Sequence, residues 1–247
     1  MDHGIKAIES AEPNLLYYVL TGSRAYGIHT KNSDYDYRGV FINTPEEIYG
    51  LNVRESQEYS GDIILHSLRK FVKLAMGANP NILELLFLSD DCILYTHPVF
   101  KIILDNRDLF LSKKVKHTYG GYAISQLKRN KHKSTHGTMR KKYISGNPKD
   151  PVDSKFAGHT IRLMLAGINI LQTGQLTPKL TGKDLLLIKL IRYGLFFRSG
   201  THFYNYTMRL NDKLEKEYNT STLQHYPDIR KINNLLIKAH IEYYEKR

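Results

Sequence analysis

The sequence predicts an α+β protein in which a small mixed-sheet domain is followed by an α-helical C-terminal region. Short apolar and aromatic runs bounded by turn residues occur before about residue 97, whereas segments with helical spacing of apolar residues dominate after it. The chain has 247 residues, 41% of them hydrophobic, which is enough to bury a core in one large domain or two small ones. We expect two domains, residues 1–108 and 109–247.

Three segments of the N-terminal part have the features of strands. They are residues 15–20, residues 34–42 and a segment that begins near Tyr59. The first, "LLYYVL", is apolar and aromatic and ends at Thr-Gly, which is typical of a buried strand that leads into a turn. The third passes without a breaker into "LRKFVKLAM", whose apolar residues have helical spacing. Asn79-Pro80 then begins a short helix, because proline suits a first helical turn.

The rest of the chain is rich in predicted helices. The apolar pattern predicts them over residues 97–108, 115–128, 155–173, 183–197, 203–218 and 228–246. The helix over 155–173 is strongly amphipathic, and Gly174 should end it. Residues 129–152 combine many basic side chains with Gly, Ser, Thr and Pro, so we expect a basic loop there.

Charge is unevenly distributed along the chain. Residues 1–100 hold 8 Lys/Arg and 13 Asp/Glu, whereas residues 101–247 hold 28 and 11, a net charge of +17. Residues 109–149 contain eleven Lys/Arg, three His and no acid, unlike a solvated helix face that mixes signs. The alternative is a merely soluble basic surface, but this segment favours a polyanionic partner.

The basic segment supplies the candidate nucleic-acid contacts. They are Lys128, Arg129, Lys131, Lys133, Arg140, Lys141 and Lys142. Tyr119 and Tyr122 lie beside them in the sequence, and aromatic rings of this kind can stack on bases.

Several classes of protein are disfavoured by composition. No run approaches the ~20 apolar residues of a membrane span, and the first residues are too polar for a signal peptide, so we expect a cytoplasmic protein. Cys92 is the only cysteine, which excludes a disulfide within the chain and a cysteine-based zinc cluster. We expect Cys92 to be a buried, inert thiol.

A Gly-Ser pair precedes two closely spaced aspartates by eleven residues. Asp34 and Asp36 fall at positions i and i+2, so in a strand they point to the same side with Cα atoms ~6.6 Å apart. Two unpaired carboxylates at one spot would repel each other, and Mg²⁺ bridging substrate phosphates would relieve this. Gly22 and Ser23 add backbone N–H groups and a hydroxyl that can hold phosphate oxygens. This combination indicates nucleotide chemistry.

Other interpretations of these residues are weaker. A Walker loop requires Gly-Lys-Ser/Thr at its end, but Gly27 is followed by Ile28. "DYDYRG" resembles the first half of a calcium loop, yet position 5 is Arg38 and position 12 is Pro45 instead of Glu. A polar strand edge with acids facing water is the remaining alternative. The Gly-Ser pair upstream of Asp-Tyr-Asp, between two strand signals, favours the nucleotide site.

Five sequence blocks carry a resemblance to a known family. They are G-S-R-A-Y-G, S-D-Y-D-Y-R-G-V, D-I-I-L-H-S-L-R-K-F, N-P-N-I-L-E-L-L-F and K-F-A-G-H-T-I-R-L. Together they resemble the DNA polymerase beta nucleotidyltransferase superfamily, and within it the predicted RNA-repair nucleotidyltransferases of bacteria and phages. The resemblance runs from about Leu15 to about Thr177.

The resemblance implies roles for individual residues. Gly22 and Ser23 would hold the nucleoside triphosphate, and Asp34 and Asp36 would bind two Mg²⁺ ions. The superfamily places a third carboxylate on a neighbouring strand, and Asp62 is our candidate because it is the only acid inside the third apolar strand.

Further cations are candidates for nucleotide binding. Arg24 lies next to the Gly-Ser pair and could meet phosphate charge. Lys155, His159 and Arg162 fall at i, i+4 and i+7, which places them in one stripe of the long helix. That stripe would grip the triphosphate or the backbone of the acceptor. The alternative is an ordinary solvated helix face.

The resulting function is nucleotidyl transfer. With two Mg²⁺ ions, the enzyme would add a nucleoside monophosphate from an NTP to the 3′ hydroxyl of an RNA and release pyrophosphate, with tRNA or a nicked tRNA as the natural acceptor. Two alternatives remain. One is nucleotidylation of a Tyr, Ser or Thr hydroxyl in a protein, and the other is a nucleic-acid-binding module on an inactive transferase scaffold.

Overall fold

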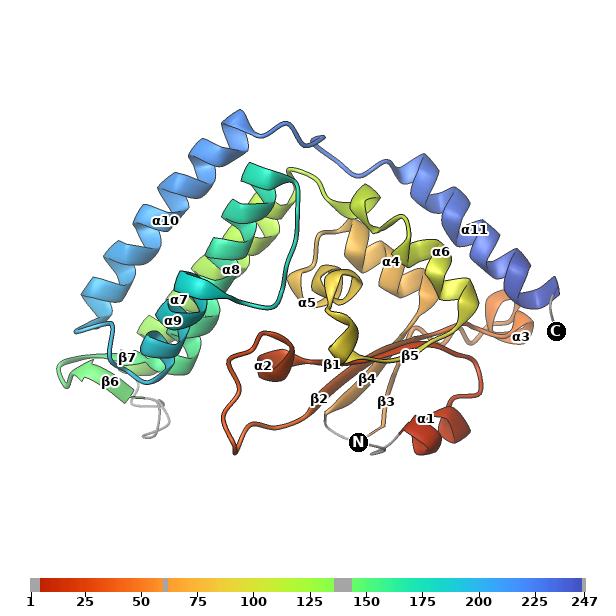
Figure 1. Cartoon of the computed structure of the whole chain (residues 1–247), viewed down its shortest axis with the longest axis horizontal. Helices are drawn as coiled ribbons and strands as arrows, with labels where there is room; N and C mark the ends of the chain where they lie inside the picture. The colour runs from red at the N-terminus through yellow and green to blue at the C-terminus, as the bar shows by residue number, and fades with distance from the viewer. Residues whose placement is uncertain (1–4, 60–61, 136–143, 246–247) are drawn as a thin grey trace. The chain divides into compact units, whose positions relative to one another are not determined.

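The computed structural model describes residues 5–59, 62–135 and 144–245. The chain divides into two compact units (Figure 1). Unit 1 consists of Met1–Phe110 together with Pro227–Arg247, and unit 2 consists of Leu111–Tyr226. The expected second domain, 109–247, therefore differs from the observed unit 2 because the last helix packs in unit 1.

Unit 1 is built on a five-stranded mixed sheet with strand order β3-β4-β2-β1-β5. The strands are β1 Leu15–Thr21, β2 Asp36–Phe41, β3 Ser56–Glu58, β4 Ile63–Ser67 and β5 Ile93–Thr96. β2 and β4 are parallel, and the other neighbouring strands are antiparallel. The mixed sheet followed by helices confirms the predicted α+β class.

The inner strand β1, between β2 and β5, is buried on both faces. Tyr17 stacks on Phe100 on one face, with ring centroids 4.5 Å apart, while the adjacent Tyr18 stacks on Tyr37 on the other, at 5.4 Å. Both tyrosines are 0% exposed. A strand with two covered faces needs a continuous apolar run rather than an alternating one, which explains "LLYYVL".

The third expected strand begins later than predicted, and another strand precedes it. The strand was expected to begin near Tyr59, but β4 begins at Ile63, and Glu58 of the preceding strand β3 pairs antiparallel with Ile64 of β4. β3 and β5 have three and four residues, too few to leave a periodic pattern in the sequence.

Short helices accompany the sheet of unit 1. They are α1 Ile5–Ala11, α2 Gly22–Ala25, α3 Pro45–Tyr49, α4 Leu68–Met76, α5 Pro80–Leu83 and α6 Lys101–Leu104. Ser67 caps α4 by accepting a hydrogen bond from the Lys70 backbone N–H at 3.3 Å. In Figure 1, α4 and α6 lie over one face of the sheet and α1 lies on the other side. Ile8 of α1 packs against Tyr18 in the buried cluster of that second face.

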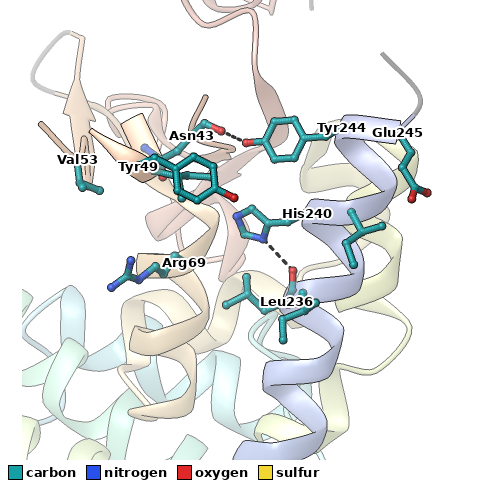
Figure 2. A pocket seen from close by; sticks show the side chains of 11 residues that line it. Asn43, Tyr49, Val53, Arg69, Leu236, His240, Tyr244 and Glu245 are labelled. Atoms are coloured by element: carbon teal, nitrogen blue, oxygen red, sulfur yellow. Dashed lines mark hydrogen bonds between the residues drawn. The ribbon is translucent and has the colours of Figure 1, made fainter. Parts of the chain in front are cut away.

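The last helix, α11 Ile229–Glu245, is anchored to unit 1 by its two tyrosines. The Tyr243 hydroxyl donates to Asn14 Oδ1 at 3.1 Å, and the Tyr244 hydroxyl donates to the carbonyl oxygen of Asn43 (Figure 2). A groove of about 550 Å³ lies beside this contact, between α11 and the segment that follows β2. Helical periodicity predicts α11 but contains no information about the partner it packs against.

Unit 2 is a helical bundle with a small hairpin. Its elements are a π-helical turn Lys116–Gly120, α7 Gly121–Thr135, β6 Ile144–Asn147, β7 Asp150–Asp153, α8 Ser154–Thr173, α9 Gly182–Arg192 and α10 Gly200–Thr220. The central helix α8 packs against α7, α9 and α10. Asp153 caps its start, and Gly174 ends it in the left-handed conformation at φ 68°, as the sequence predicts.

Two expectations for unit 2 were wrong. Residues 129–152 were expected to form a loop, but α7 continues to Thr135 and β6 and β7 form a hairpin. The helix expected over 183–197 ends at Arg192, because Gly194 adopts φ 75° and turns the chain. Within the described ranges, no helix is both long and apolar enough to cross a membrane.

A buried carboxylate ties α1 to the segment after α3. Glu12 is 1% exposed and forms an ion pair with Arg54, whose Nη2 lies 3.2 Å from Glu12 Oε1. Arg54 also donates from Nε to Glu47 Oε1 at 2.8 Å, and the Tyr59 hydroxyl donates to Glu12 Oε2 at 3.1 Å. The Arg54 guanidinium therefore forms ion pairs with two carboxylates, and one of them, Glu12, is buried.

We predict that Arg54→Met lowers the free energy of unfolding by about 3 kcal/mol, because it leaves the Glu12 carboxylate buried without its counter-charge. Urea denaturation of the whole chain measures this. Arg230→Met, which removes an exposed arginine from α11, is the matched control and should change stability by less than about 0.5 kcal/mol. Equal unfolding midpoints for the two variants would contradict the prediction.

Candidate active site

Three chain segments with the predicted site residues meet at one edge of the unit 1 sheet. β1 runs antiparallel to β2, so its last residue, Thr21, pairs with the first residue of β2, Asp36. β2 runs parallel to β4, and Tyr37 pairs with Ile63. The Gly-Ser pair after β1, the aspartates at the start of β2 and Asp62 before β4 therefore share this edge.

Asp34 and Asp36 lie on either side of Tyr35 where β2 begins. The strand was expected to begin at Asp34, but β2 begins at Asp36, so Asp34 belongs to the loop before it. Tyr35 and Tyr37 stack on each other with ring centroids 6.4 Å apart, and Tyr37 stacks on Tyr18. Since successive side chains of a strand alternate, Asp36 lies on the face opposite to the Tyr37 ring. Asp34 is exposed and Asp36 is half-buried.

Asp62 lies next to Asp36 but outside the strand in which it was expected. It occupies the turn immediately before β4 and is exposed. Its carbonyl oxygen accepts a hydrogen bond from the Tyr37 backbone N–H at 2.8 Å and one from Arg38 Nη1 at 3.2 Å. These bonds continue the parallel register by one residue, so Asp62 neighbours Asp36 at the sheet edge.

The closest approach at this edge joins Gly22 to Asp36. A Cβ atom built on Gly22 would lie 2.2 Å from Asp36 Oδ2, and Gly22 has φ 67°. Both the position and the backbone conformation therefore require glycine. Ser23 follows directly in the short helix α2, which begins at Gly22.

Arg24 was predicted to bind nucleotide, and its side chain holds the loop before β2. Nη2 donates to the Ser33 carbonyl oxygen at 2.8 Å, and Nε donates to the Asp34 carbonyl oxygen at 3.3 Å. The guanidinium carbon also lies 3.5 Å from the ring centroid of Tyr35. Arg24 thus fixes the backbone that carries Asp34.

The donor atoms at this edge suit a hard cation. Asp34, Asp36 and Asp62 offer carboxylate oxygens only, which is the ligand type that Mg²⁺ prefers. No group of three or more Asp, Glu, His or Cys side chains within the described ranges is already arranged around one point. The ligand type of these three residues therefore fits Mg²⁺, and their side chains would have to converge on the ion when it binds.

The stripe predicted on α8 runs from water into the core of unit 2. Lys155 is exposed, His159 is half-buried against Tyr122 with ring centroids 5.4 Å apart, and Arg162 is only 2% exposed. The alternative of an ordinary solvated face is therefore wrong for Arg162. The helical spacing is as predicted, but the neighbouring helices cover the second half of the stripe.

A further cation, Arg192, lies beside this stripe. A Cβ atom on Gly158 would lie 2.8 Å from Arg192 Cγ, so the arginine packs across α8 where that helix has no side chain. Burial, then Arg162, Arg192 and Lys155, lower the pKa of His159 to about 3. His159 is therefore neutral among three cations. Sequence reasoning missed Arg192, because its proximity depends on how α9 crosses α8.

The predicted nucleic-acid contacts are only partly described. Lys128 and Arg129 are exposed on α7. Lys131 and Lys133 belong to the same helix, but their side chains lie outside the described residues, as do Arg140, Lys141 and Lys142 altogether. Tyr119 is 0% exposed and cannot stack on bases, contrary to expectation.

The depressed pKa of His159 predicts a loss of stability in acid. Below pH 6.5 His159 is protonated in the unfolded chain, whereas in the folded chain it is protonated only near pH 3. Over this range the free energy of unfolding falls by about 1.4 kcal/mol per pH unit. Between pH 7 and pH 5 we expect the parent protein to lose about 1–2 kcal/mol more than His159→Gln. Urea denaturation at both pH values measures this. His225→Gln, at an exposed histidine of unit 2, should follow the parent, and equal losses in all three proteins would contradict the prediction.

Comparison with known proteins gives a family match and similar proteins. A model of the RNA repair pathway DNA polymerase beta family matches residues 2–188. An uncharacterized 38.9 kDa protein in the nrdC-mobD intergenic region of Enterobacteria phage T4 is 32% identical over 119 residues, covering 42% of this chain and 35% of that protein. The uncharacterized protein YcgL of Bacillus subtilis (strain 168) is 33% identical over 97 residues, covering 37% of this chain and 36% of its own.

The matched regions span about a third of the length of these relatives. Among solved structures, a nucleotidyltransferase-like protein from Exiguobacterium sibiricum 255-15 aligns over 87% of this chain and 72% of its own, at 10% identity and a TM-score of 0.31. The family match covers most of the chain, including all of the sheet edge described above. The chain belongs to the RNA repair pathway DNA polymerase beta family.

Proposed function

We infer that this protein is a Mg²⁺-dependent nucleotidyltransferase that adds a nucleoside monophosphate from an NTP to the 3′ hydroxyl of an RNA and releases pyrophosphate. The observation that carries this is the approach of Gly22 to Asp36, where a Cβ atom would lie 2.2 Å from the carboxylate. It brings a phosphate-binding turn against a metal-binding carboxylate. The description of the family as part of an RNA repair pathway supports RNA as the acceptor.

Different residues at the sheet edge would bind the triphosphate and the metal. The turn at Gly22 and Ser23 would hold the triphosphate through backbone N–H groups and the hydroxyl. Asp34, Asp36 and Asp62 would hold Mg²⁺, which neutralises the triphosphate and acidifies the acceptor hydroxyl. Only part of that edge is fixed by packing, because Asp34 and Asp62 are exposed.

The reaction replaces a phosphoanhydride bond of the NTP by a phosphodiester bond to the acceptor. The acceptor oxygen bonds to the α-phosphorus as the bond from that phosphorus to the bridging oxygen of the β-phosphate breaks. Pyrophosphate leaves with the electron pair of the broken bond. The hydroxyl proton passes to a base, for which Asp62 is the candidate because it borders Asp36.

The cations of unit 2 would meet the phosphates of the substrates. Of the stripe proposed from the sequence, the exposed Lys155 would do so, whereas Arg162 is buried and lies with Arg192 around the neutral His159. The exposed Lys128 and Arg129 on α7 would contact the backbone of a tRNA-like acceptor. We assign the basic half of the chain to RNA on this basis.

Replacing the paired carboxylates tests the proposed chemistry. Asp34→Asn and Asp36→Asn should each reduce transfer at least about 100-fold, since each removes a charge that holds the metal at the reacting phosphate. The assay supplies each NTP separately with total tRNA and Mg²⁺ and measures the mass added to the RNA. Asp105→Asn, at an exposed aspartate of the same unit, is the control and should keep the parental rate.

Two results would contradict the proposal. Parental rates in both aspartate variants would remove the carboxylates from the chemistry. Label from NTP that survives RNase but disappears with protease would show that the acceptor is a protein hydroxyl instead.

Arg24 provides a separate prediction. If it positions Asp34 rather than binding the nucleotide, Arg24→Ala should lower kcat about tenfold or more and leave the KM for NTP within about twofold of the parent, because the lost bonds go to the Ser33 and Asp34 carbonyl oxygens. Steady-state kinetics at saturating RNA measure both constants. A large rise in KM at unchanged kcat would instead assign Arg24 to phosphate binding.

A further inference from the structure

Unit 2 contains a polar groove between the start of α7 and the second half of α10. Its volume is about 530 Å³, within the range of ligand sites in proteins. The π-helical turn that leads into α7 forms one side, and Asn211 and Glu215 of α10 form the other. We call this the α7–α10 groove.

Two glycines allow the helices to meet closely beneath the groove. A Cβ atom on Gly120 would lie 2.7 Å from Leu214 Cδ2, and one on Gly167 would lie 3.2 Å from Leu214 Cδ1. Leu214 therefore inserts between the start of α7 and α8. Asn211 and Glu215 lie three residues before and one residue after it, so this packing fixes them at the rim of the groove.

The α7 side of the groove includes bare backbone. Gly121 lines the groove, and a Cβ atom built there would meet no atom within 4 Å. Its φ is an ordinary helical −61°, so glycine is not required by the backbone. A side chain at this position would therefore begin in open space at the wall of the groove.

The charges around the groove are mainly positive, with one acid among them. Lys128 and Arg129 are exposed on α7, and His117 is exposed on the preceding turn. Glu215 carries the negative charge, and its Oε1 lies 2.7 Å from Lys116 Nζ. The groove therefore presents cations beside a carboxylate that keeps spare acceptor positions.

We propose that the α7–α10 groove binds the ribose-phosphate backbone of an RNA strand, with Lys128 and Arg129 on phosphates and Glu215 accepting a hydrogen bond from a ribose 2′ hydroxyl. RNA repeats an anion and a hydroxyl donor in every nucleotide, which matches cations beside an acceptor. An acidic peptide offers anions without that regular hydroxyl. This inference rests on the proposed function, since it locates the RNA acceptor.

The test is equilibrium binding of the whole chain to a fluorescent 12-nucleotide RNA and to the DNA of the same sequence, without NTP. Gly121→Leu should weaken RNA binding at least about tenfold by filling the groove, and leucine favours a helix more than glycine does. Lys128→Ala combined with Arg129→Ala should weaken both nucleic acids and reduce the salt slope by about 0.7 per lost phosphate contact. Circular dichroism would verify that each variant is folded.

Glu215→Ala separates the sugar contact from simple charge. It should lower RNA affinity several-fold and leave DNA affinity unchanged or higher, because it removes the acceptor and a negative charge together. Glu217→Ala, on the same helix outside the groove, is its control. Lys183→Ala combined with Arg209→Ala, which removes two exposed cations elsewhere in unit 2, is the control for the charge variants.

Two results would overturn the proposal. The first is that Gly121→Leu and the double variant of Lys128 and Arg129 both bind RNA with the same affinity as the control double variant of Lys183 and Arg209. The second is equal affinity of the parent for RNA and DNA. The binding test contains no NTP, so it is independent of the transfer assay. RNA binding that depends on the groove, in a protein that shows no transfer when NTP is supplied, would contradict the proposed function alone. Transfer by a protein whose groove variants bind RNA like the parent would contradict the groove proposal alone.

Discussion

The contact of Gly22 with Asp36 is the constraint around which the candidate active site is organised. A turn with φ 67° follows the inner strand β1, and the absence of a side chain lets a carboxylate of the neighbouring strand occupy the space beside it. The antiparallel pairing of β1 with β2 sets this position, and the parallel pairing of β2 with β4 brings Asp62 alongside. Sheet register thus determines which acids can act together.

The surrounding packing fixes the backbone of the site and leaves part of its chemistry exposed. Tyr18, Tyr37 and Tyr35 form a continuous stack, and the side chain of Asp36, between Tyr35 and Tyr37, lies on the opposite face of β2. Arg24 holds the loop that carries Asp34. A hard cation binds through oxygen ligands that can adjust around it, so exposed carboxylates on a fixed backbone are suited to that role.

In unit 2, glycines on the helices make room for side chains of neighbouring helices. Gly158 admits the Arg192 side chain onto α8, and Gly120 and Gly167 admit Leu214 between helices. In each case a missing Cβ lets an element approach and thereby places polar groups together. The first approach adds Arg192 to the burial and to Arg162, which together lower the pKa of His159 to about 3, and the other shapes the α7–α10 groove.

The sequence by itself determined the α+β class, the buried strand β1, the helix α8 with its stop at Gly174, and the Gly-Ser and Asp-Tyr-Asp residues, because these depend on local periodicity and spacing. Only the tertiary structure decided the two-strand arrangement around Glu58, the place of α11 in unit 1, the turn position of Asp62, the loop contacts of Arg24 and the proximity of Arg192 to His159. These features follow from contacts between particular residues, some nearby in the chain and others far apart, and such contacts leave no periodic signal in a single sequence.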